Sequence, residues 1–219
     1  MGLRLRCGLR ILLIIGLVLG GSVGAPPRAK AAGPPRPGCF AETNQCVQGQ
    51  FLAYWQANGG LAQFGFPLTG EQPELLEDGM TYTVQYFERV RLEYHPENLA
   101  PYDVLLGQFG RRLIESAPNG VYPDTGPSVP QAGATYFPET GHNVGGSFSE
   151  YWRANGGLAQ FGLPLTELRE ERLVPGSPTS LVQYFERARF ELHPENAAPY
   201  AVLLGQFGRQ VLTESGTGR

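Results

Sequence analysis

The chain has 219 residues, of which 42% are hydrophobic and 11% aromatic, which is enough apolar material for a packed core and excludes a wholly disordered protein. Glycine (30) and proline (19) are both frequent, which indicates many turns and short elements. The formal net charge is −3, and an acidic chain does not favour nucleic-acid binding, because Lys and Arg must neutralise the phosphate backbone.

The first 31 residues have the pattern of a secretory signal peptide. Three arginines precede the apolar run 11–19, and Ala31 ends a small-x-small cleavage pattern. The run is shorter than the roughly 20 apolar residues of a membrane span, although an uncleaved anchor remains the alternative. Residues 1–31 hold five of the 17 basic residues and none of the 20 acidic ones, so the mature chain would carry 12 basic and 20 acidic groups. We therefore expect a secreted or cell-envelope-associated protein with a net charge of about −8, no nucleic-acid partner and no membrane span after signal removal.

The remaining chain is dominated by an internal duplication. Residues 40–69 align without gaps on residues 137–166, and after one inserted residue 84–114 match 182–212. The sequence therefore predicts two tandem homologous modules, which we name the first repeat (39–115) and the second repeat (136–213). Short segments rich in Pro and Gly are predicted as a tether (32–38) and a linker (116–135), and residues 214–219 as a flexible tail.

The two cysteines of the first repeat are both missing from the second. Cys39 aligns with Tyr136 and Cys46 with Asn143. Joint presence and joint absence predicts a Cys39–Cys46 disulfide, which would contribute about 2–3 kcal/mol by closing a short loop in an exported protein. Metal ligation by the pair is the alternative, but no other cysteine would complete such a site. We expect no metal and no cofactor.

Each repeat is predicted to begin with a helix. Phe51, Tyr54 and Trp55 fall at i, i+3 and i+4, and the second repeat has the same spacing. Asn58 and Gly59 supply the left-handed residue that ends this helix. A single helical turn over 61–65 follows.

Two alternating segments, 81–86 and 89–94, predict β-strands. The alternation slips in phase at Phe87 and Glu88, where we expect a tight hairpin or a bulge. Apolar residues from Tyr102 to Leu113 then follow a helical period, which predicts a second amphipathic helix beginning near Pro101. The fold class is therefore α+β, with each module built as helix–turn–β-hairpin–helix.

The order of these signals resembles the LGFP repeat of bacterial cell-wall-associated proteins, which combines a tryptophan-bearing helix, a Gly-Gly, a Leu-Gly-x-Pro turn and a hairpin. The matching residues are Trp152, Gly156, Gly157, 161–164 and 184–192 in the second repeat, and Trp55, Gly59, Gly60, 64–67 and 87–94 in the first. The hairpin glycine of that family is Val90 or Ala188 here, its aromatic pair is replaced at 93–94 and 191–192, and the second helix lengthens the unit. The unit is also similar to an uncharacterised tandem repeat of exported bacterial proteins. Both resemblances imply envelope attachment or glycan binding and no catalysis.

The candidate ligand-binding residues occur in pairs, one in each repeat. Aromatic side chains would stack on sugar rings, although a module of this size also needs large side chains for its core. Arginines near the hairpin would bind hydroxyls or carboxylates. The candidates are Tyr54, Tyr151, Trp55, Trp152, Tyr86, Tyr184, Arg89, Arg187, Arg91, Arg189, His95 and His193.

Two groups of residues are candidates for catalysis. His95 and His193 each lie in Glu-x-His-Pro-Glu, which suits either a carboxylate–imidazole pair or a turn into the next element. Glu88 and Glu186 are each followed by arginine, which favours a structural ion pair over a general acid. No nucleophile motif or phosphate-binding loop is present. We therefore assign no catalytic residue.

The sequence favours an exported, non-enzymatic tandem-repeat protein that binds cell-wall or extracellular polysaccharide, with two equivalent sites adding avidity. One alternative is an extracellular scaffold in which both repeats pack as one unit and bind another exported protein. A second is a small secreted hydrolase that uses the glutamates or histidines above.

Overall fold

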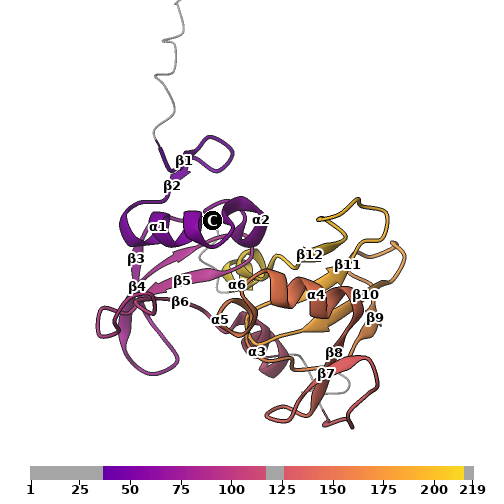
Figure 1. Cartoon of the computed structure of the whole chain (residues 1–219). Helices are drawn as coiled ribbons and strands as arrows, with labels where there is room; N and C mark the ends of the chain where they lie inside the picture. Colours follow the sequence, from indigo (N-terminus) through magenta and orange to yellow (C-terminus); the bar gives the residue numbers. More distant parts are fainter. Residues whose placement is uncertain (1–36, 117–125, 215–219) are drawn as a thin grey trace, which may run out of the picture. The chain divides into compact units, whose positions relative to one another are not determined.

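The structure is a computed structural model that describes residues 37–116 and 126–214 (Figure 1). The predicted signal peptide lies outside the described residues, as do parts of the tether, the linker and the tail. Helices and antiparallel sheets are both present, so the predicted α+β class is confirmed.

The elements follow one another in the same order in the two repeats. Those of the first repeat are β1 (Cys39–Phe40), β2 (Gln45–Cys46), α1 (Gly49–Ala57), α2 (Gly60–Phe64), β3 (Gln72–Leu75), β4 (Thr81–Tyr86), β5 (Arg91–Tyr94), β6 (Val104–Leu106) and α3 (Phe109–Glu115). Those of the second are β7 (Ala134–Phe137), β8 (His142–Gly145), α4 (Gly146–Ala154), α5 (Gly157–Phe161), β9 (Arg169–Glu171), β10 (Ser180–Tyr184), β11 (Arg189–Leu192), β12 (Val202–Leu204) and α6 (Phe207–Glu214).

A four-stranded antiparallel sheet stands in each repeat where a two-stranded hairpin was predicted. The strand orders are β3-β4-β5-β6 and β12-β11-β10-β9. The inner pair of the first sheet is the predicted hairpin, with Gln85 opposite Leu92, and its turn is closed by a hydrogen bond from the Phe87 N–H to the Val90 carbonyl. The added outer strands give each sheet a wider face on which helices can pack.

The helix predicted from Pro101 begins eight residues later, at Phe109. Residues Val104–Leu106 instead form β6, in which Leu106 pairs with Leu92. Val104 and Leu106 are buried while Leu105 is less so, and this alternation is the two-residue period of a strand. The prediction was wrong because a three-residue strand followed by a helix mimics a continuous helical period.

Helix α1 ends before Asn58 and Gly59, as predicted. The Asn58 side chain donates a hydrogen bond to the Tyr54 carbonyl (2.9 Å), and Gly59 takes the left-handed conformation with φ 95°. A Cβ on Gly60 would lie 3.2 Å from the Trp55 ring, so a small residue lets the indole cover the turn.

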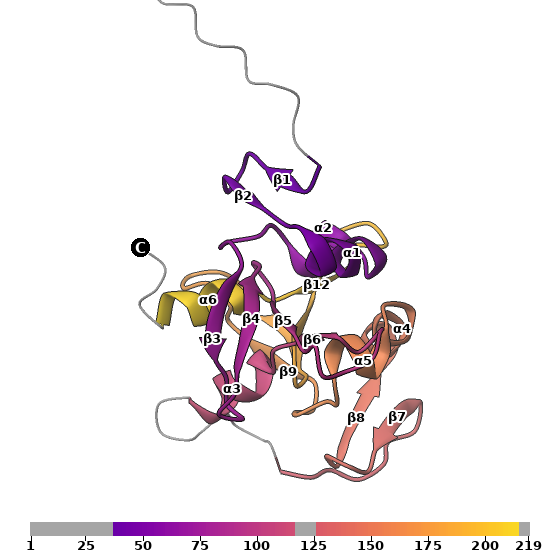
Figure 2. The same cartoon turned by 90° about the vertical axis from the view of Figure 1, so that its left-hand side faces the viewer.

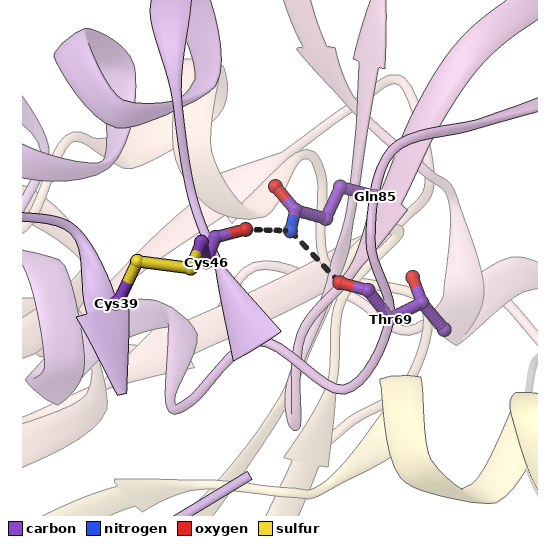
Figure 3. The surroundings of a disulfide bond; sticks show 4 residues. All are labelled: Cys39, Cys46, Thr69 and Gln85. Atoms are coloured by element: carbon purple, nitrogen blue, oxygen red, sulfur yellow. Dashed lines mark hydrogen bonds between the residues drawn. A yellow bond between two sulfur atoms is a disulfide. The ribbon is translucent and has the colours of Figure 1, made fainter. Parts of the chain in front are cut away.

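Two buried glutamines tie the N-terminal strands to the sheets. The Gln85 amide is fully buried and donates to the carbonyls of Cys46 (2.9 Å) and Thr69 (2.8 Å), beside the Cys39–Cys46 disulfide, which confirms the predicted pairing (Figure 3). Gln183 makes the same two bonds to Asn143 and Thr166. The glutamine is thus common to both repeats, whereas the disulfide belongs to the first alone.

The hydrophobic core has one part in each repeat and one part that the repeats share. The first part gathers around Phe51, Phe64 and Phe87, and its counterpart gathers around Phe148, Phe161 and Phe185. The shared part joins residues of both repeats: Val84, Tyr86, Phe109, Leu113, Val182, Tyr184, Phe207 and Val211. Helices α3 and α6 pack side by side there (Figure 2). The two repeats are therefore in direct contact and not separate beads on a linker.

Candidate functional site

An open groove of about 900 Å³ is lined by parts of both repeats. One wall is the exposed side of helix α1, a second is the segment 100–106 that leads into β6, and the third is the start of α5 with Glu186 and Arg187. Tyr54 and Tyr102 are the aromatic residues of the lining. Aromatic and polar side chains from several elements converge in this groove.

Tyr54 is held in the groove by a residue of the other repeat. Gln160 donates through its amide to the Tyr54 hydroxyl (3.0 Å) and to the Asn58 side-chain oxygen (2.9 Å). Burial raises the pKa of the Tyr54 phenol, while the bond from Gln160 and the charge of Arg187 partly offset that rise. The phenol is therefore a neutral, fixed part of the wall.

The same bonds occur reciprocally on the other side of the contact between the repeats. Gln63 donates to the Tyr151 hydroxyl (3.2 Å) and to the Asn155 side-chain oxygen (2.8 Å). Burial likewise raises the pKa of the Tyr151 phenol, with the bond from Gln63 acting against it. Tyr54 and Tyr151, predicted as ligand-binding residues, thus also join the two repeats.

Tyr102 is 65% exposed, although it lies beside the buried strand β6. A tight turn presents it, because its N–H donates to the Leu99 carbonyl (2.9 Å) and its own carbonyl accepts from the Asn98 side chain (3.1 Å). Tyr200 is 60% exposed, and Asn196 holds its carbonyl in the same way (3.2 Å). Each repeat thus offers one large exposed aromatic ring on an ordered turn, the geometry that stacking on a flat ligand needs.

Two charged residues of the groove are engaged in pairing within the protein. Glu186 accepts from Arg111 (2.6 Å) and from the Leu163 N–H (3.1 Å), and its counterpart Glu88 binds Arg209 (2.7 Å). Arg187 donates to the Leu158 carbonyl (3.2 Å). The Arg187 guanidinium lies 4.0 Å from the Glu186 carboxylate, which agrees with the ion pair expected at the bend, but the closer partner of each glutamate is an arginine of the other repeat.

Arg89, the counterpart of Arg187, donates to the Leu61 carbonyl (3.1 Å). Both arginines are half-buried, and each donates to a carbonyl of the short helix α2 or α5, which precedes it in the chain. Their guanidinium groups therefore donate hydrogen bonds to backbone carbonyls near the contact between the repeats.

Arg91 lies inside the protein rather than on a ligand-binding face. It is 1% exposed and donates to Glu93 (2.9 and 2.7 Å) and to Glu74 (2.7 Å), with its guanidinium 5.3 Å from the centre of the Phe109 ring. Burial lowers the pKa of Arg91, but the charge of Glu93 and the hydrogen bond with Tyr86 outweigh it, and the net shift is upward.

Arg189 repeats this arrangement with Glu191 (2.9 and 2.7 Å) and the Tyr184 hydroxyl (3.2 Å). Tyr86 and Tyr184 are 3% and 0% exposed, so their rings belong to the core. The structure thus brings Tyr86 together with Arg91, and Tyr184 with Arg189, but not with the groove.

Trp55 and Trp152 cover the turns between the first two helices of their repeats. The Trp55 indole donates to the Gly65 carbonyl (3.4 Å) and packs edge-on against Phe40 (5.4 Å between ring centres). Trp152 does the same with Gly162 (3.2 Å) and Phe137 (5.3 Å). Both indoles are half-buried, and neither lines the groove.

His95 and His193 directly follow β5 and β11. Each forms a carboxylate–imidazole pair and also takes part in a turn. The Nδ1 of His95 lies 2.9 Å from Glu97 and its Nε2 3.4 Å from Glu93, while its carbonyl accepts from the Asn98 N–H. His193 makes the corresponding contact with Glu195 (2.9 Å). The pKa of Glu97 is lowered by a backbone hydrogen bond and by His95. The histidines therefore fix the turn that presents Tyr102 and Tyr200.

Several residues of the site were not singled out from the sequence. Gln63 and Gln160 lie within the longest run shared by the repeats, 57–65 and 154–162, which is the signal that marks them. Tyr102 belongs to the segment predicted as an amphipathic helix, and neither Tyr102 nor its counterpart Tyr200 is among the predicted ligand-binding residues. His142 is 1% exposed and lies 3.4 Å from Glu167; the first repeat has Gln45 and Gly70 at these positions, so no repeated pattern marked this pair.

Within residues 37–116 and 126–214, no three His, Cys, Asp or Glu side chains are grouped so as to hold a metal ion. No helix in the same segments has the length and hydropathy needed to cross a bilayer.

Comparisons with known proteins leave the groove as the main guide to function. The chain matches no protein-family model, no curated protein and no solved structure.

Proposed function

We propose that the chain is an exported, non-enzymatic protein that binds a polysaccharide of the cell envelope or the extracellular space. We also propose that its repeats are two homologous modules, related to the LGFP-like repeats that the sequence resembles. The matching order of elements and the matching strand registers support the second proposal, since Gln85 faces Leu92 and Gln183 faces Phe190 at equivalent positions.

The observation that carries the binding proposal is the groove with Tyr54 and Tyr102 on its walls. Sugar rings bind to proteins through flat aromatic faces and through hydrogen bonds from amide and carboxylate groups to hydroxyls. Tyr102 offers an exposed ring, and Asn58, Asp103 and Gln50 offer polar groups along the same groove. Its open form suits a chain that passes through, as a polymer does.

The contacts between the repeats bear on avidity. Tyr102 and Tyr200 are presented by equivalent turns, and the repeats are joined by a shared core and by reciprocal glutamine bonds. Two binding sites would then be held at a fixed spacing, which favours a repetitive ligand whose period matches that spacing.

Tyr102→Ala should reduce retention of the full mature chain on purified cell-wall polysaccharide by at least about fivefold, because an aromatic contact contributes about 1 kcal/mol. The measurement is co-sedimentation over a range of protein concentrations. Met80→Ala is the matched control, since Met80 is 60% exposed on a turn that does not line the groove, and it should leave retention unchanged.

Tyr200→Ala tests the second site, and we expect it to weaken retention further when combined with Tyr102→Ala. Equal retention of the unmodified chain and the double variant would contradict the proposal. Release of new reducing ends from the polysaccharide would favour the hydrolase alternative. Capture of a purified envelope protein that depends on Tyr102, without binding to polysaccharide, would favour the scaffold.

A further inference from the structure

We infer that the groove prefers a polysaccharide with free amino groups, such as a polymer of a deacetylated hexosamine, and that Asp103 pairs with the amine. This inference rests on the proposed function and specifies its ligand class. It starts from the charges of the groove, whose charged lining residues are Asp103, Glu186 and Arg187. The groove thus has two negatively charged carboxylates and one positively charged guanidinium.

The pairing within the protein leaves Asp103 as the available charge. Both oxygens of Glu186 are used, one by Arg111 (2.6 Å) and one by the Leu163 N–H (3.1 Å). Arg187 donates to the carbonyls of Leu158 (3.2 Å) and Leu106 (3.4 Å). The Asp103 side chain makes no hydrogen bond and no ion pair with any residue that the structure describes. Its carboxylate is therefore free to bind a ligand.

The backbone holds Asp103 in place although its side chain has no partner. Its carbonyl accepts from the His95 N–H (2.8 Å) at the start of β6, and the adjacent residue is the exposed Tyr102. A carboxylate beside an aromatic face suits an ammonium group, which gains a charge-assisted hydrogen bond from one and a cation–π contact from the other.

Helix α1 adds to the negative character of the groove. Ala57 and Asn58, which line the groove, lie at the C-terminal end of this nine-residue helix. The carbonyl groups of a helix C-terminus carry a partial negative charge. The helix end and Asp103 thus favour the same sign of ligand charge.

The second repeat lacks this carboxylate. Asp103 aligns with Ala201, while the exposed aromatic is kept as Tyr200. The preference for an amine is therefore expected only in the groove that contains Asp103. A single substitution of Asp103 should remove this preference without removing the aromatic contact of Tyr102.

The test compares two soluble probes on the full mature chain, a β-1,4-linked glucosamine hexamer and the same hexamer fully N-acetylated, by calorimetry at pH 5.5. The probes share one backbone and differ in the charge and bulk of the amino substituent. We expect the amine form to bind roughly tenfold more tightly, as a charge-assisted hydrogen bond predicts. Asp103→Asn should bring the two affinities to within about twofold by weakening binding of the amine form.

Glu71→Gln is the matched control, because it removes the same charge from an exposed residue outside the groove and should leave the tenfold preference intact. If Glu71→Gln also removed the preference, or if Asp103→Asn retained it, the assignment to Asp103 would be overturned.

The remaining outcomes separate the inference from the proposed function. Equal binding of the two hexamers, or no binding of either while Tyr102-dependent retention on cell wall persists, would overturn the inference alone. Loss of Tyr102 dependence on every polysaccharide would overturn the proposed function itself.

Discussion

Arg91 is a charged side chain with 1% of its surface exposed, and the residues around it compensate for that burial. Its guanidinium binds Glu93 and Glu74 and lies against the Phe109 ring. Breaking a buried ion pair by removing one partner leaves the other charge desolvated, which costs more than the pair contributes. Arg91 therefore stabilises the folded protein and does not contact a ligand.

Arg91→Ala should lower the free energy of unfolding by about 3–5 kcal/mol, measured by urea denaturation. Arg189→Ala is the comparison, because the Arg189 side chain is 16% exposed against 2% for Arg91, and we expect a smaller loss. An equal or larger loss for Arg189→Ala would contradict this account of burial.

The sequence predicted part of the candidate site at the scale of single residues. Tyr54 was identified from its helical spacing, because that pattern is local and repeats at Tyr151. Tyr102 was not identified, since the sequence does not distinguish an exposed tyrosine on a turn from a buried tyrosine on a helix. Gln160 reaches Tyr54 across 106 positions of sequence, and no local pattern encodes such a contact.

At the scale of elements, the local signals were the reliable ones. The helix at Phe51, the single turn after it and the inner strand pair were all predicted, since each depends on a period or a turn within a few residues. Strands β3 and β6 were missed because they are short and sit at sheet edges, where pairing partners decide the structure. Val104–Leu106 fits either period until its pairing with β5 is known.

Helix α3 approaches the other repeat too closely for any side chain at Gly110. A Cβ there would overlap the Phe185 carbonyl oxygen, and one at Gly208 would overlap that of Phe87. The Arg111 N–H, next in sequence, donates to the Glu186 carbonyl (3.2 Å), so the backbones themselves are in contact. These glycines permit the repeats to pack.

Gly110→Ala should therefore destabilise the protein by about 1–3 kcal/mol, the usual cost of overpacking. Gly70→Ala provides the control, since a Cβ at Gly70 would meet only the Gln45 side chain at 3.9 Å. Thermal denaturation of both variants measures the difference, and a Gly110→Ala protein as stable as the control would show that the helix has room to move.

At the scale of the whole described chain, the shared core makes each repeat depend on the other. Val84 and Tyr86 of one repeat pack in the same cluster as Val182 and Tyr184 of the other. A repeat that unfolded alone would expose this apolar surface on its partner.

The protein should consequently unfold in a single cooperative transition, with the calorimetric and van't Hoff enthalpies in agreement. Scanning calorimetry at several heating rates measures this. Two resolved transitions would indicate that the repeats fold independently and that the shared cluster contributes little.

The N-terminal strands are fastened differently in the two repeats. In the first, Cys39 and Cys46 are bonded covalently. In the second, Asn143 stands in place of Cys46, and its side chain donates to the Val129 carbonyl (2.9 Å) and to Glu167 (3.2 Å). A thiol reductant would therefore release the link between β1 and β2 of the first repeat. The N-terminal strands of the second repeat, which Asn143 holds by hydrogen bonds, would keep their contacts.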